Sequence, residues 1–293
     1  MAGPKVFLDY DQAALDAAYE QTVYAANRDQ LLARYESASE LTRRHLGPPQ
    51  RFAYGPSEIE RLDVFPAAEA NAPVEIFVHG GAWRGGLARS YAFPAETFVR
   101  AGIHFVVPDF VWIQDAPDGL ATMVDQLRRA LAWLYRNATR FGGNPERLYL
   151  SGHSSGGHLA AVLLTTDWRE LGLPADVVKG GMCASGIYDL KPVRLSARSS
   201  YVKLDDAMEH GFSPGRHLDA LRAPLIVASG TLETPEFIRH AREFAAAVAA
   251  AGKPVESLVL DGYNHFEVIE TLANPYGILG RAALGQIISG KRR

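Results

Sequence analysis

The chain has 293 residues, 47% of them hydrophobic, which is enough to fill the core of one large α/β domain or two small ones. Thirty lysines and arginines stand against 33 aspartates and glutamates, so the net charge is −3, and no basic block is present that could neutralise a run of phosphates. Nucleic acid is therefore excluded as an expected partner.

The N-terminal stretch MAGPKVFLDYDQ contains one apolar triplet, whereas a secretory signal needs an apolar run of roughly 7–15 residues. No segment approaches the roughly 20 apolar residues that span a membrane. Cys183 is the single cysteine, so it cannot form an internal disulfide, and its apolar surroundings favour a small buried side chain in a reducing compartment. We therefore expect a cytoplasmic protein with neither an export signal nor a membrane anchor.

Residues 11–46 are rich in alanine, leucine, glutamate and arginine, and Leu15, Tyr19 and Val23 recur at helical spacing. A glycine and two prolines then end the helical segment, at about residue 50. We expect these N-terminal helices to pack over the rest of the fold, either as a structural pad on the sheet or as part of a cap over the pocket.

Beyond this segment, short β-branched runs alternate with helical stretches. The runs are continuously apolar, which is typical of strands buried on both faces. They lie at residues 74–79, 103–107, 147–150, 177–185, 224–229 and 255–260, with helical stretches at 119–140, 156–167 and 235–251. This alternation predicts an α/β fold with a mostly parallel, doubly wound sheet, and no linker or repeat divides residues 1–293, so we expect a single domain.

The stretch RLYLSGHSSGGHLAAVLL, residues 147–164, places a serine where a predicted strand turns into a predicted helix. Ser154 lies between Gly152 and Gly156, in the G-x-S-x-G pattern that is typical of a nucleophile elbow. In such an elbow the serine backbone is strained, and its small neighbours let strand and helix approach closely. Ser154 is therefore the predicted nucleophile, and the N–H of Ser155 at the helix start is expected to bind a developing oxyanion.

Residues 74–86, VEIFVHGGAWRGG, end a predicted strand with a glycine-rich turn. Acyl transfer needs hydrogen-bond donors on the far side of the carbonyl from the nucleophile, and glycines let main-chain N–H groups face it. Gly81 and Ala82 are the candidate donors, and His79 and Gly80 would shape the loop. The alternative is an ordinary glycine-rich turn, whereas a phosphate-binding loop is disfavoured because neither G-x-x-x-x-G-K-[ST] nor G-x-G-x-x-G is present.

A serine nucleophile needs a base, and in this fold class the order along the chain is serine, acid, histidine. Five histidines follow the serine, namely His158, His210, His217, His240 and His265. The first four lie in predicted helices or in a loop that no strand precedes. His265 follows a strand and a turn, so it is the predicted base; the alternative for it is a structural role in the turn.

The orienting carboxylate should follow the preceding strand, in the stretch PLIVASGTLETPEF. Glu233 lies in that turn and is the predicted acid, because either aspartate or glutamate can hold imidazole in the required tautomer. Glu236, which already enters the next helix, and Asp205 or Asp206 in a remote loop are the alternatives.

A metal site is not expected. His153 and His158 are five positions apart, whereas two ligands on one helix face would be four apart, and no carboxylate or cysteine set completes a site. We therefore expect neither a metal nor another cofactor.

These motifs resemble the arylformamidases, or kynurenine formamidases, of the α/β-hydrolase fold, and the resemblance covers nearly the whole chain. HGGAW resembles the family's H-G-G-x-W signature, and GHSSGGHLAA resembles its nucleophile segment G-H-S-A-G-A-H-L-A. ETPEFIRHAREF resembles D-S-P-E-F-x-R-Q-S-R-E-F, and NHFEVIE resembles D-H-F-E-I-V-E. The resemblance implies Ser154 as nucleophile, His265 as base and Glu233 in the place of the family's aspartate.

The chain also departs from the family pattern. Besides Glu233, Ala82 stands where animal members carry a tyrosine, and the turn at residues 107–119 looks about two residues longer than the family's D-Y-x-x-A-P turn. Because Ala82 removes bulk beside the predicted oxyanion donors, we hypothesise that the acyl pocket admits groups larger than formyl.

The resemblance implies a serine hydrolase that cleaves an aryl formamide of the N-formylkynurenine type, or a related amide or ester, through an acyl-enzyme. The expected partner is thus a small aromatic amide or ester, and a homodimer is a possible assembly. Aromatic residues that follow strand ends or lie in loops could stack on such a substrate. The candidates are Trp83, Trp112 and Tyr188, with Phe110 and Tyr201 in similar positions.

Two alternatives remain. A general carboxylesterase or amidase that accepts acyl groups larger than formyl would use the same three residues and differ only in substrate. A binding protein with a decayed site belongs to another class, and the presence of serine, histidine and carboxylate in one chain argues against it.

Overall fold

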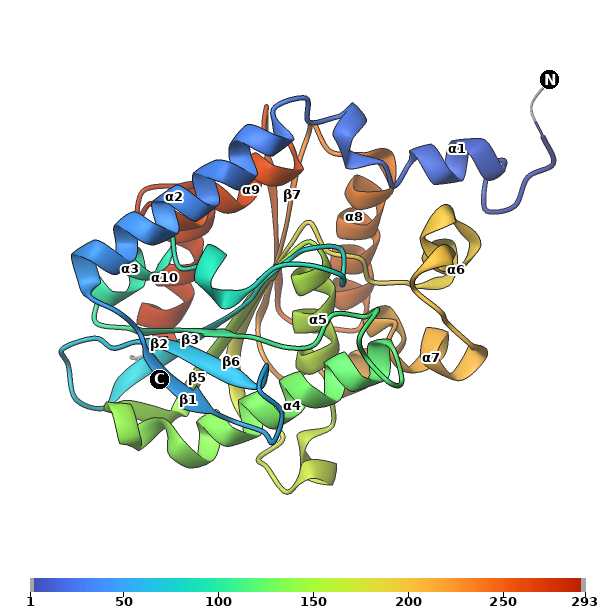
Figure 1. Cartoon of the computed structure of the whole chain (residues 1–293). Coiled ribbons are helices and arrows are strands. Elements are labelled where there is room, and N and C mark those ends of the chain that lie inside the picture. The colour runs from blue at the N-terminus through green and yellow to red at the C-terminus, as the bar shows by residue number, and fades with distance from the viewer. Residues whose placement is uncertain (1–2, 291–293) are drawn as a thin grey trace.

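The computed structural model describes residues 3–290, and its centre is one eight-stranded sheet (Figure 1). The strands are β1 (Gln50–Ala53), β2 (Arg61–Phe65), β3 (Ala72–Val78), β4 (His104–Pro108), β5 (Gly143–His153), β6 (Val178–Ala184), β7 (Leu225–Gly230) and β8 (Val255–Leu260). Their order across the sheet is β1-β2-β4-β3-β5-β6-β7-β8. All pairs from β4 to β8 are parallel, whereas β1 pairs with β2, and β2 with β4, in antiparallel orientation. The predicted mostly parallel sheet is confirmed.

The helices connect and cover these strands. They are α1 (Gln12–Ala17), α2 (Arg28–Leu46), α3 (Ala95–Arg100), α4 (Leu120–Asn137), α5 (Ser155–Leu164), α6 (Lys191–Leu195), α7 (Asp206–Gly211), α8 (Pro235–Ala250), α9 (His265–Glu270) and α10 (Ile278–Ser289). Among residues 3–290, no helix is both long enough and apolar enough to cross a lipid bilayer.

The two faces of the sheet are both covered, which explains why the central strands are continuously apolar. Side chains of α4, α5 and α8 pack with Val74, Ile76 and Val78 of β3 in one core cluster. Side chains of α2, α3, α9 and α10 pack with Phe77 of the same strand in the other. Successive residues of β3 thus point to opposite layers, as strand geometry requires, and the predicted doubly wound arrangement is confirmed.

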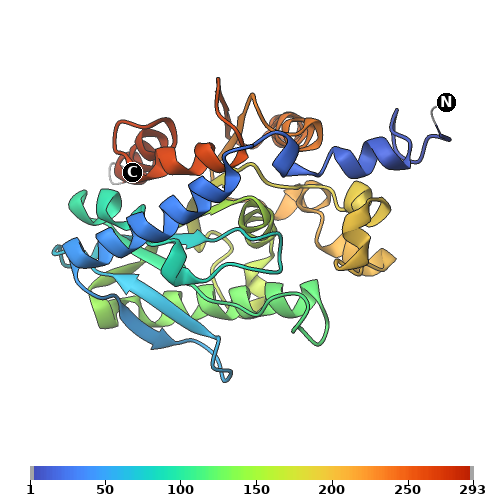
Figure 2. The same ribbon diagram turned by 45° about the horizontal axis from the view of Figure 1, so that its top comes forward.

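The N-terminal segment differs from the continuous helical pattern of residues 11–46. It consists of α1, the 3₁₀ turn η1 (Gln21–Val23) and α2, and the side chains of Asp11 and Glu20 cap the first two pieces by accepting backbone N–H bonds. In Figure 2 these pieces form one strip across the molecule, with α2 beside α9 and α1 beside α6. The segment therefore bridges structures far apart in the sequence.

Glu75 is a buried carboxyl in the middle of β3. It is 3% exposed, and within residues 3–290 its side chain has one hydrogen bond, from the hydroxyl of Ser151 on β5. Burial raises its pKa to about 8, because the charged form loses its hydration. The neutral acid is thus the form that suits the fold at neutral pH.

This pKa makes stability depend on pH. An unfolded glutamate titrates near pH 4.5, so between about pH 4.5 and 8 the folded chain binds one more proton than the unfolded chain. The free energy of unfolding then falls as pH rises, by up to about 1.4 kcal/mol per pH unit. Glu75→Gln cannot ionise, so we expect it to gain stability relative to the wild type between pH 5 and pH 8. Urea unfolding at both pH values measures this, and a constant difference would contradict it.

Candidate active site

Ser154 lies in a tight turn between β5 and α5. Its backbone has φ 58° and ψ −126°, a conformation that side-chain-bearing residues rarely adopt, and its N–H donates to the carbonyl oxygen of Ala184 at 3.0 Å. The turn leaves no room around its glycines. A Cβ on Gly152 would lie 2.2 Å from the carbonyl oxygen of Gly156, and a Cβ on Gly156 would lie 2.1 Å from that of Val78. The strand, the serine and the helix can therefore approach only because both positions are glycine.

Gly156→Ala tests this packing. The new methyl group would meet backbone atoms, which cannot rotate away, so we expect a loss of about 1–3 kcal/mol or more in the free energy of unfolding. Gly285→Ala in α10 is the matched control, because no atom lies within 4 Å of the position a Cβ would take there, and alanine should stabilise the helix by about 0.5–1 kcal/mol. Chemical denaturation of both variants measures the contrast; equal effects of the two changes would refute the steric argument.

The structure brings Ser154, His265 and Glu233 together from three separate parts of the chain. The Ser154 hydroxyl lies 2.9 Å from Nε2 of His265, and Nδ1 of His265 lies 2.7 Å from Oε2 of Glu233. His265 is the first residue of α9, which Asn264 starts with a capping box that also involves Glu267. The cap fixes the beginning of the helix, and with it the position of the imidazole.

Glu233 is held at both carboxyl oxygens. While Oε2 faces His265, Oε1 accepts hydrogen bonds from the hydroxyl of Ser185 at 2.6 Å and from the N–H of Gly230 at 2.7 Å. Glu233 is only 2% exposed, so these charge-assisted bonds replace the water that the carboxylate has lost. Sequence reasoning missed Ser185, because its contact with Glu233 spans 48 positions and depends on β6 lying beside β7.

His153 supports the same arrangement from the other side. Its Nε2 lies 2.8 Å from the carbonyl oxygen of His265, and the two rings are 4.8 Å apart between centroids. Burial lowers the pKa of His153 well below its ordinary value, and His265 lowers it further. His153 is thus a neutral imidazole, and its Nε2–H donates to the backbone carbonyl oxygen of His265.

The alternative acid Glu236 does not reach His265. Its carboxylate, wholly buried, forms an ion pair with Arg239 at 2.7 Å, and the hydroxyl of Tyr19 donates to it at 3.4 Å. Asp206 instead pairs with Arg194 in a different part of the chain. The structure therefore brings only Glu233, of the carboxylates considered, to Nδ1 of His265.

The backbone N–H groups of Gly81, Ala82 and Ser155 have no acceptor among residues 3–290. Gly81 and Ala82 line the cleft that contains Ser154, and Ser155 follows it in the chain. Gly81 and Ala82 have φ of 128° and 54°, and a Cβ on Gly81 would lie 2.1 Å from the carbonyl oxygen of Gly85. The loop is anchored by the buried His79, whose Nδ1 contacts the carbonyl oxygen of Gly80 at 2.9 Å. Free N–H groups of this kind are suited to bind an oxyanion.

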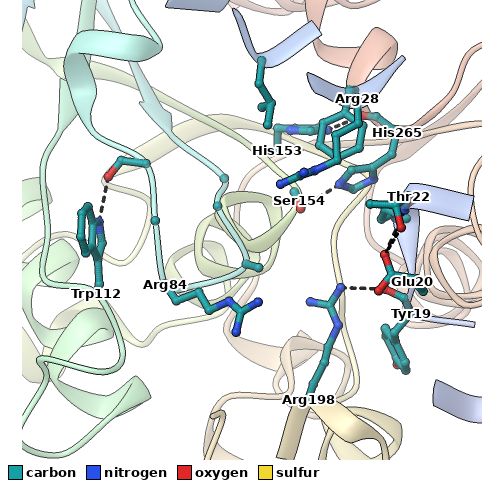
Figure 3. A pocket seen from close by; sticks show the side chains of 18 of the residues that line it. Tyr19, Glu20, Thr22, Arg28, Arg84, Trp112, His153, Ser154, Arg198 and His265 are labelled. Atoms are coloured by element: carbon teal, nitrogen blue, oxygen red, sulfur yellow. Dashed lines mark hydrogen bonds between the residues drawn. The ribbon is translucent and has the colours of Figure 1, made fainter. Parts of the chain in front are cut away.

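A cleft of about 870 Å³ opens over Ser154 and His265 (Figure 3). Its wall comes from the glycine-rich loop, the turn around Tyr201 and, largely, the N-terminal segment, which contributes Tyr19, Glu20, Arg28 and Tyr35 among others. The size falls within the range of small-molecule sites. The sequence was compatible with an N-terminal segment that pads the sheet or one that caps the pocket. In the structure this segment forms part of the cleft wall.

Of the three aromatic residues predicted to contact substrate, only Trp112 lines the cleft, and its indole N–H donates to the carbonyl oxygen of Gly86 at 2.8 Å. Trp83 is 1% exposed and donates to Nδ1 of His158 at 3.1 Å, behind the loop. Tyr188 is buried against Phe244, with ring centroids 4.1 Å apart. The prediction that Trp83 and Tyr188 contact substrate thus does not fit the structure, because both rings are buried in the core and neither lines the cleft.

Tyr201, for which the sequence predicts a position similar to these candidates, also lines the cleft, whereas Phe110 does not. The rest of the aromatic lining comes from residues that were not predicted, namely Tyr19, Tyr35, Tyr91 and Phe266. Residues 3–290 contain no cluster of three or more histidine, cysteine, aspartate or glutamate side chains arranged to hold a metal ion.

Comparison with known proteins gives a consistent result. A family model described as BD-FAE matches residues 62–176. The kynurenine formamidase of Danio rerio is 31% identical over 242 residues, covering 80% of this chain and 80% of the relative, and the carboxylesterase NlhH of Mycobacterium tuberculosis is 28% identical over 248 residues, covering 75% of each. The crystal structure of a candidate thioesterase from Silicibacter sp. TM1040 matches with a TM-score of 0.80 at 24% identity, over 94% of this chain and 98% of that one. The predicted α/β-hydrolase fold is confirmed.

Proposed function

Because the chain belongs to the kynurenine formamidase family of α/β-hydrolases, we propose that it is a serine hydrolase that cleaves an aryl formamide, or a related amide or ester, through an acyl-enzyme. The observation that carries this proposal is the continuous hydrogen-bonded series from the hydroxyl of Ser154 through the imidazole of His265 to the carboxylate of Glu233. Such a series is what activates a serine hydroxyl as a nucleophile.

In the proposed mechanism His265 takes the proton of Ser154 as the oxygen attacks the substrate carbonyl. Glu233 stabilises the imidazolium that forms, and holds the ring with its proton on Nδ1. The N–H groups of Gly81, Ala82 and Ser155 bind the oxyanion. His265 then protonates the leaving amine or alcohol, and a water molecule attacks the acyl-enzyme by the same route.

The aromatic lining of the cleft supports an aryl substrate, since flat rings stack well on tyrosine and tryptophan. The N-terminal segment acts in this proposal as a cap, because η1, the two residues before it and α2 form one wall of the cleft. A cap that excludes water strengthens the electrostatic interactions of the site.

A fluorophosphonate probe tests the nucleophile directly. We expect one equivalent of label, on Ser154, identified by mass spectrometry of the digested protein. Hydrolysis rates on formanilide and phenyl acetate then test the reaction class. Absence of both labelling and hydrolysis would refute the proposal and favour a binding protein.

A general carboxylesterase is the second candidate, and the likeness to the Mycobacterium tuberculosis carboxylesterase favours it. It would use the same groups, so only relative rates separate the two. Preference for phenyl esters over formanilides at equal concentration, after correction for the intrinsic reactivity of each bond, would support the carboxylesterase.

The acyl preference depends on Ala82, which lines the cleft beside the proposed oxyanion donors. Because its side chain is a single methyl group, we expect kcat/KM for acetanilide and butyranilide to stay within about 10-fold of the formanilide value, once intrinsic reactivity is taken into account. A pocket that selected acyl groups by size would instead change kcat/KM by about 10–200-fold for each added methylene. Ala82→Tyr keeps the backbone N–H and should restore a preference for formyl. A steep preference for formyl in the wild type would contradict this expectation.

A further inference from the structure

Two arginine side chains point into the cleft from opposite walls. Arg84 comes from the glycine-rich loop, two residues after Ala82, and Arg198 comes from the 3₁₀ turn η5 (Ala197–Ser200). Figure 3 shows the two guanidinium groups facing each other across the space below Ser154. Since consecutive Cα atoms are about 3.8 Å apart, the Cα of Arg84 lies within about 7.6 Å of that of Ala82. The two cations are thus part of the cleft that contains the nucleophile.

Aromatic rings and a backbone carbonyl hold these guanidinium groups in place. Arg84 lies over the ring of Tyr201, with its Cζ 4.4 Å from the ring centroid. Arg198 lies over the ring of Tyr19 at 5.2 Å and donates to the carbonyl oxygen of Tyr19 at 3.0 Å. Such contacts fix the plane of a guanidinium without using a carboxylate as partner.

Neither guanidinium forms an ion pair with a carboxylate in the part of the chain that the structure describes. Arg28, the third arginine of the cleft, differs because it pairs with Asp29 at 2.9 Å. Glu20 also lines the cleft: hydrogen bonds from the N–H and the hydroxyl of Thr22 lower its pKa, and the nearby charges of Arg198 and Arg28 lower it further. Glu20 nevertheless forms no direct ion pair with Arg198, so among residues 3–290 the N–H donors of Arg84 and Arg198 are not used by a carboxylate.

We propose that Arg84 and Arg198 form a subsite that binds a carboxylate carried by the aryl portion of the substrate. The inference rests on the proposed function, and it narrows the substrate class from aryl amides and esters in general to anionic ones. A guanidinium offers a planar pair of N–H donors that matches a carboxylate, and the rings of Tyr201 and Tyr19 beside the two cations suit an aryl group that bears it. If the two arginines instead had a merely structural role, they would only pack in the wall of the cleft, and the enzyme would not distinguish anionic from neutral substrates.

Matched substrates test the charge preference. The acid 3-formamidobenzoate and its neutral amide 3-formamidobenzamide have nearly the same shape and the same scissile bond. We expect the wild type to have a kcat/KM at least 10-fold higher for the acid, chiefly through a lower KM. This ratio should fall in Arg84→Gln and approach about 1 in Arg84→Gln/Arg198→Gln, because each substitution removes a charge-assisted hydrogen bond. Raising the salt concentration should lower the wild-type ratio, since Arg84 is exposed.

Arg89→Gln is the matched control, because Arg89 is exposed, lies on the same loop and does not line the cleft. It changes the net charge equally and should leave the ratio as in the wild type. Thermal unfolding of each variant reports whether packing has been lost. A parallel loss for acid and amide in the arginine variants would indicate the structural role and overturn the proposal.

Equilibrium binding separates this inference from the proposed function. Calorimetric titration of 3-aminobenzoate and 3-aminobenzamide needs no turnover, and we expect tighter binding of the acid to the wild type and a reduced preference in Arg84→Gln. If the wild type bound 3-aminobenzoate more tightly than 3-aminobenzamide but hydrolysed neither formamide, the proposed function would be refuted, whereas the carboxylate subsite at Arg84 and Arg198 would be supported. Hydrolysis with equal binding of both compounds, or a preference unchanged in the double variant, would overturn the subsite and leave the hydrolase proposal intact.

Discussion

Replacing Ser154 by alanine is expected to lower kcat on formanilide by about 10⁴–10⁶-fold, because without the hydroxyl no acyl-enzyme forms and only transition-state binding by the remaining groups persists. The methyl group occupies the place of the Cβ that is already present, and the backbone conformation at φ 58° is unchanged. The fold should therefore be preserved. Steady-state kinetics with a protein concentration high enough to detect 10⁻⁵ of wild-type turnover measures the loss.

The serine on the exposed face of α2, Ser37, provides a control. Its hydroxyl donates to the carbonyl oxygen of Arg34 and it lies outside the cleft, so Ser37→Ala should retain wild-type kinetics. Ser154→Ala should also lose fluorophosphonate labelling while its thermal unfolding midpoint stays near that of the wild type. Activity above 10% of wild type in Ser154→Ala, with the variant folded, would show that another group is the nucleophile.

The sequence predicted the parallel part of the sheet and the residues that meet at its edge, because both follow from local patterns. Buried parallel strands are continuously apolar, and chain order together with the strand and turn context predicts Glu233 and His265. Strands β1 and β2 escaped prediction because charged residues interrupt them. Arg51 and Asp63 form an ion pair across the two strands, and such a pair leaves no apolar run to detect.

The cleft wall could not be predicted, because it is formed by segments distant in sequence. Ser185 has no motif of its own, and its bond to Glu233 exists only because neighbouring strands end together. Trp83 is a residue for which the sequence predicted a place in the site that the structure does not give it. An aromatic residue beside a glycine-rich loop suggests a stacking surface, but its φ of 62° and its bond to His158 turn the ring into the core. Burial lowers the pKa of His158 to about 4, so that its Nδ1 is free to accept this bond.

Glu233→Gln is expected to lower kcat by about 10³–10⁴-fold, because the amide reverses the tautomer of His265. The glutamine oxygen would keep the bonds from Gly230, whose backbone N–H can only donate, and from the hydroxyl of Ser185. The amide nitrogen must then face Nδ1 of His265, and this nitrogen can only donate. The imidazole proton would move to Nε2, where it meets the Ser154 hydroxyl and prevents the ring from accepting the proton of that hydroxyl.

Three companion variants separate this effect from a general loss of charge or packing. Glu233→Asp retains the acceptor but is one methylene shorter, so the carboxylate must reach His265 from farther away, and we expect a smaller loss, of about 10–100-fold, in line with the cost of an ångström-scale misplacement. Ser185→Ala removes one of the bonds that fix Oε1 and should cost less than Glu233→Gln. Glu256→Gln on the exposed edge of β8 changes the same charge and should leave kcat unchanged. If Glu233→Gln retained more than a tenth of wild-type kcat with the fold intact, Glu233 would not be the group that sets the tautomer of His265, and another group would have to orient the imidazole.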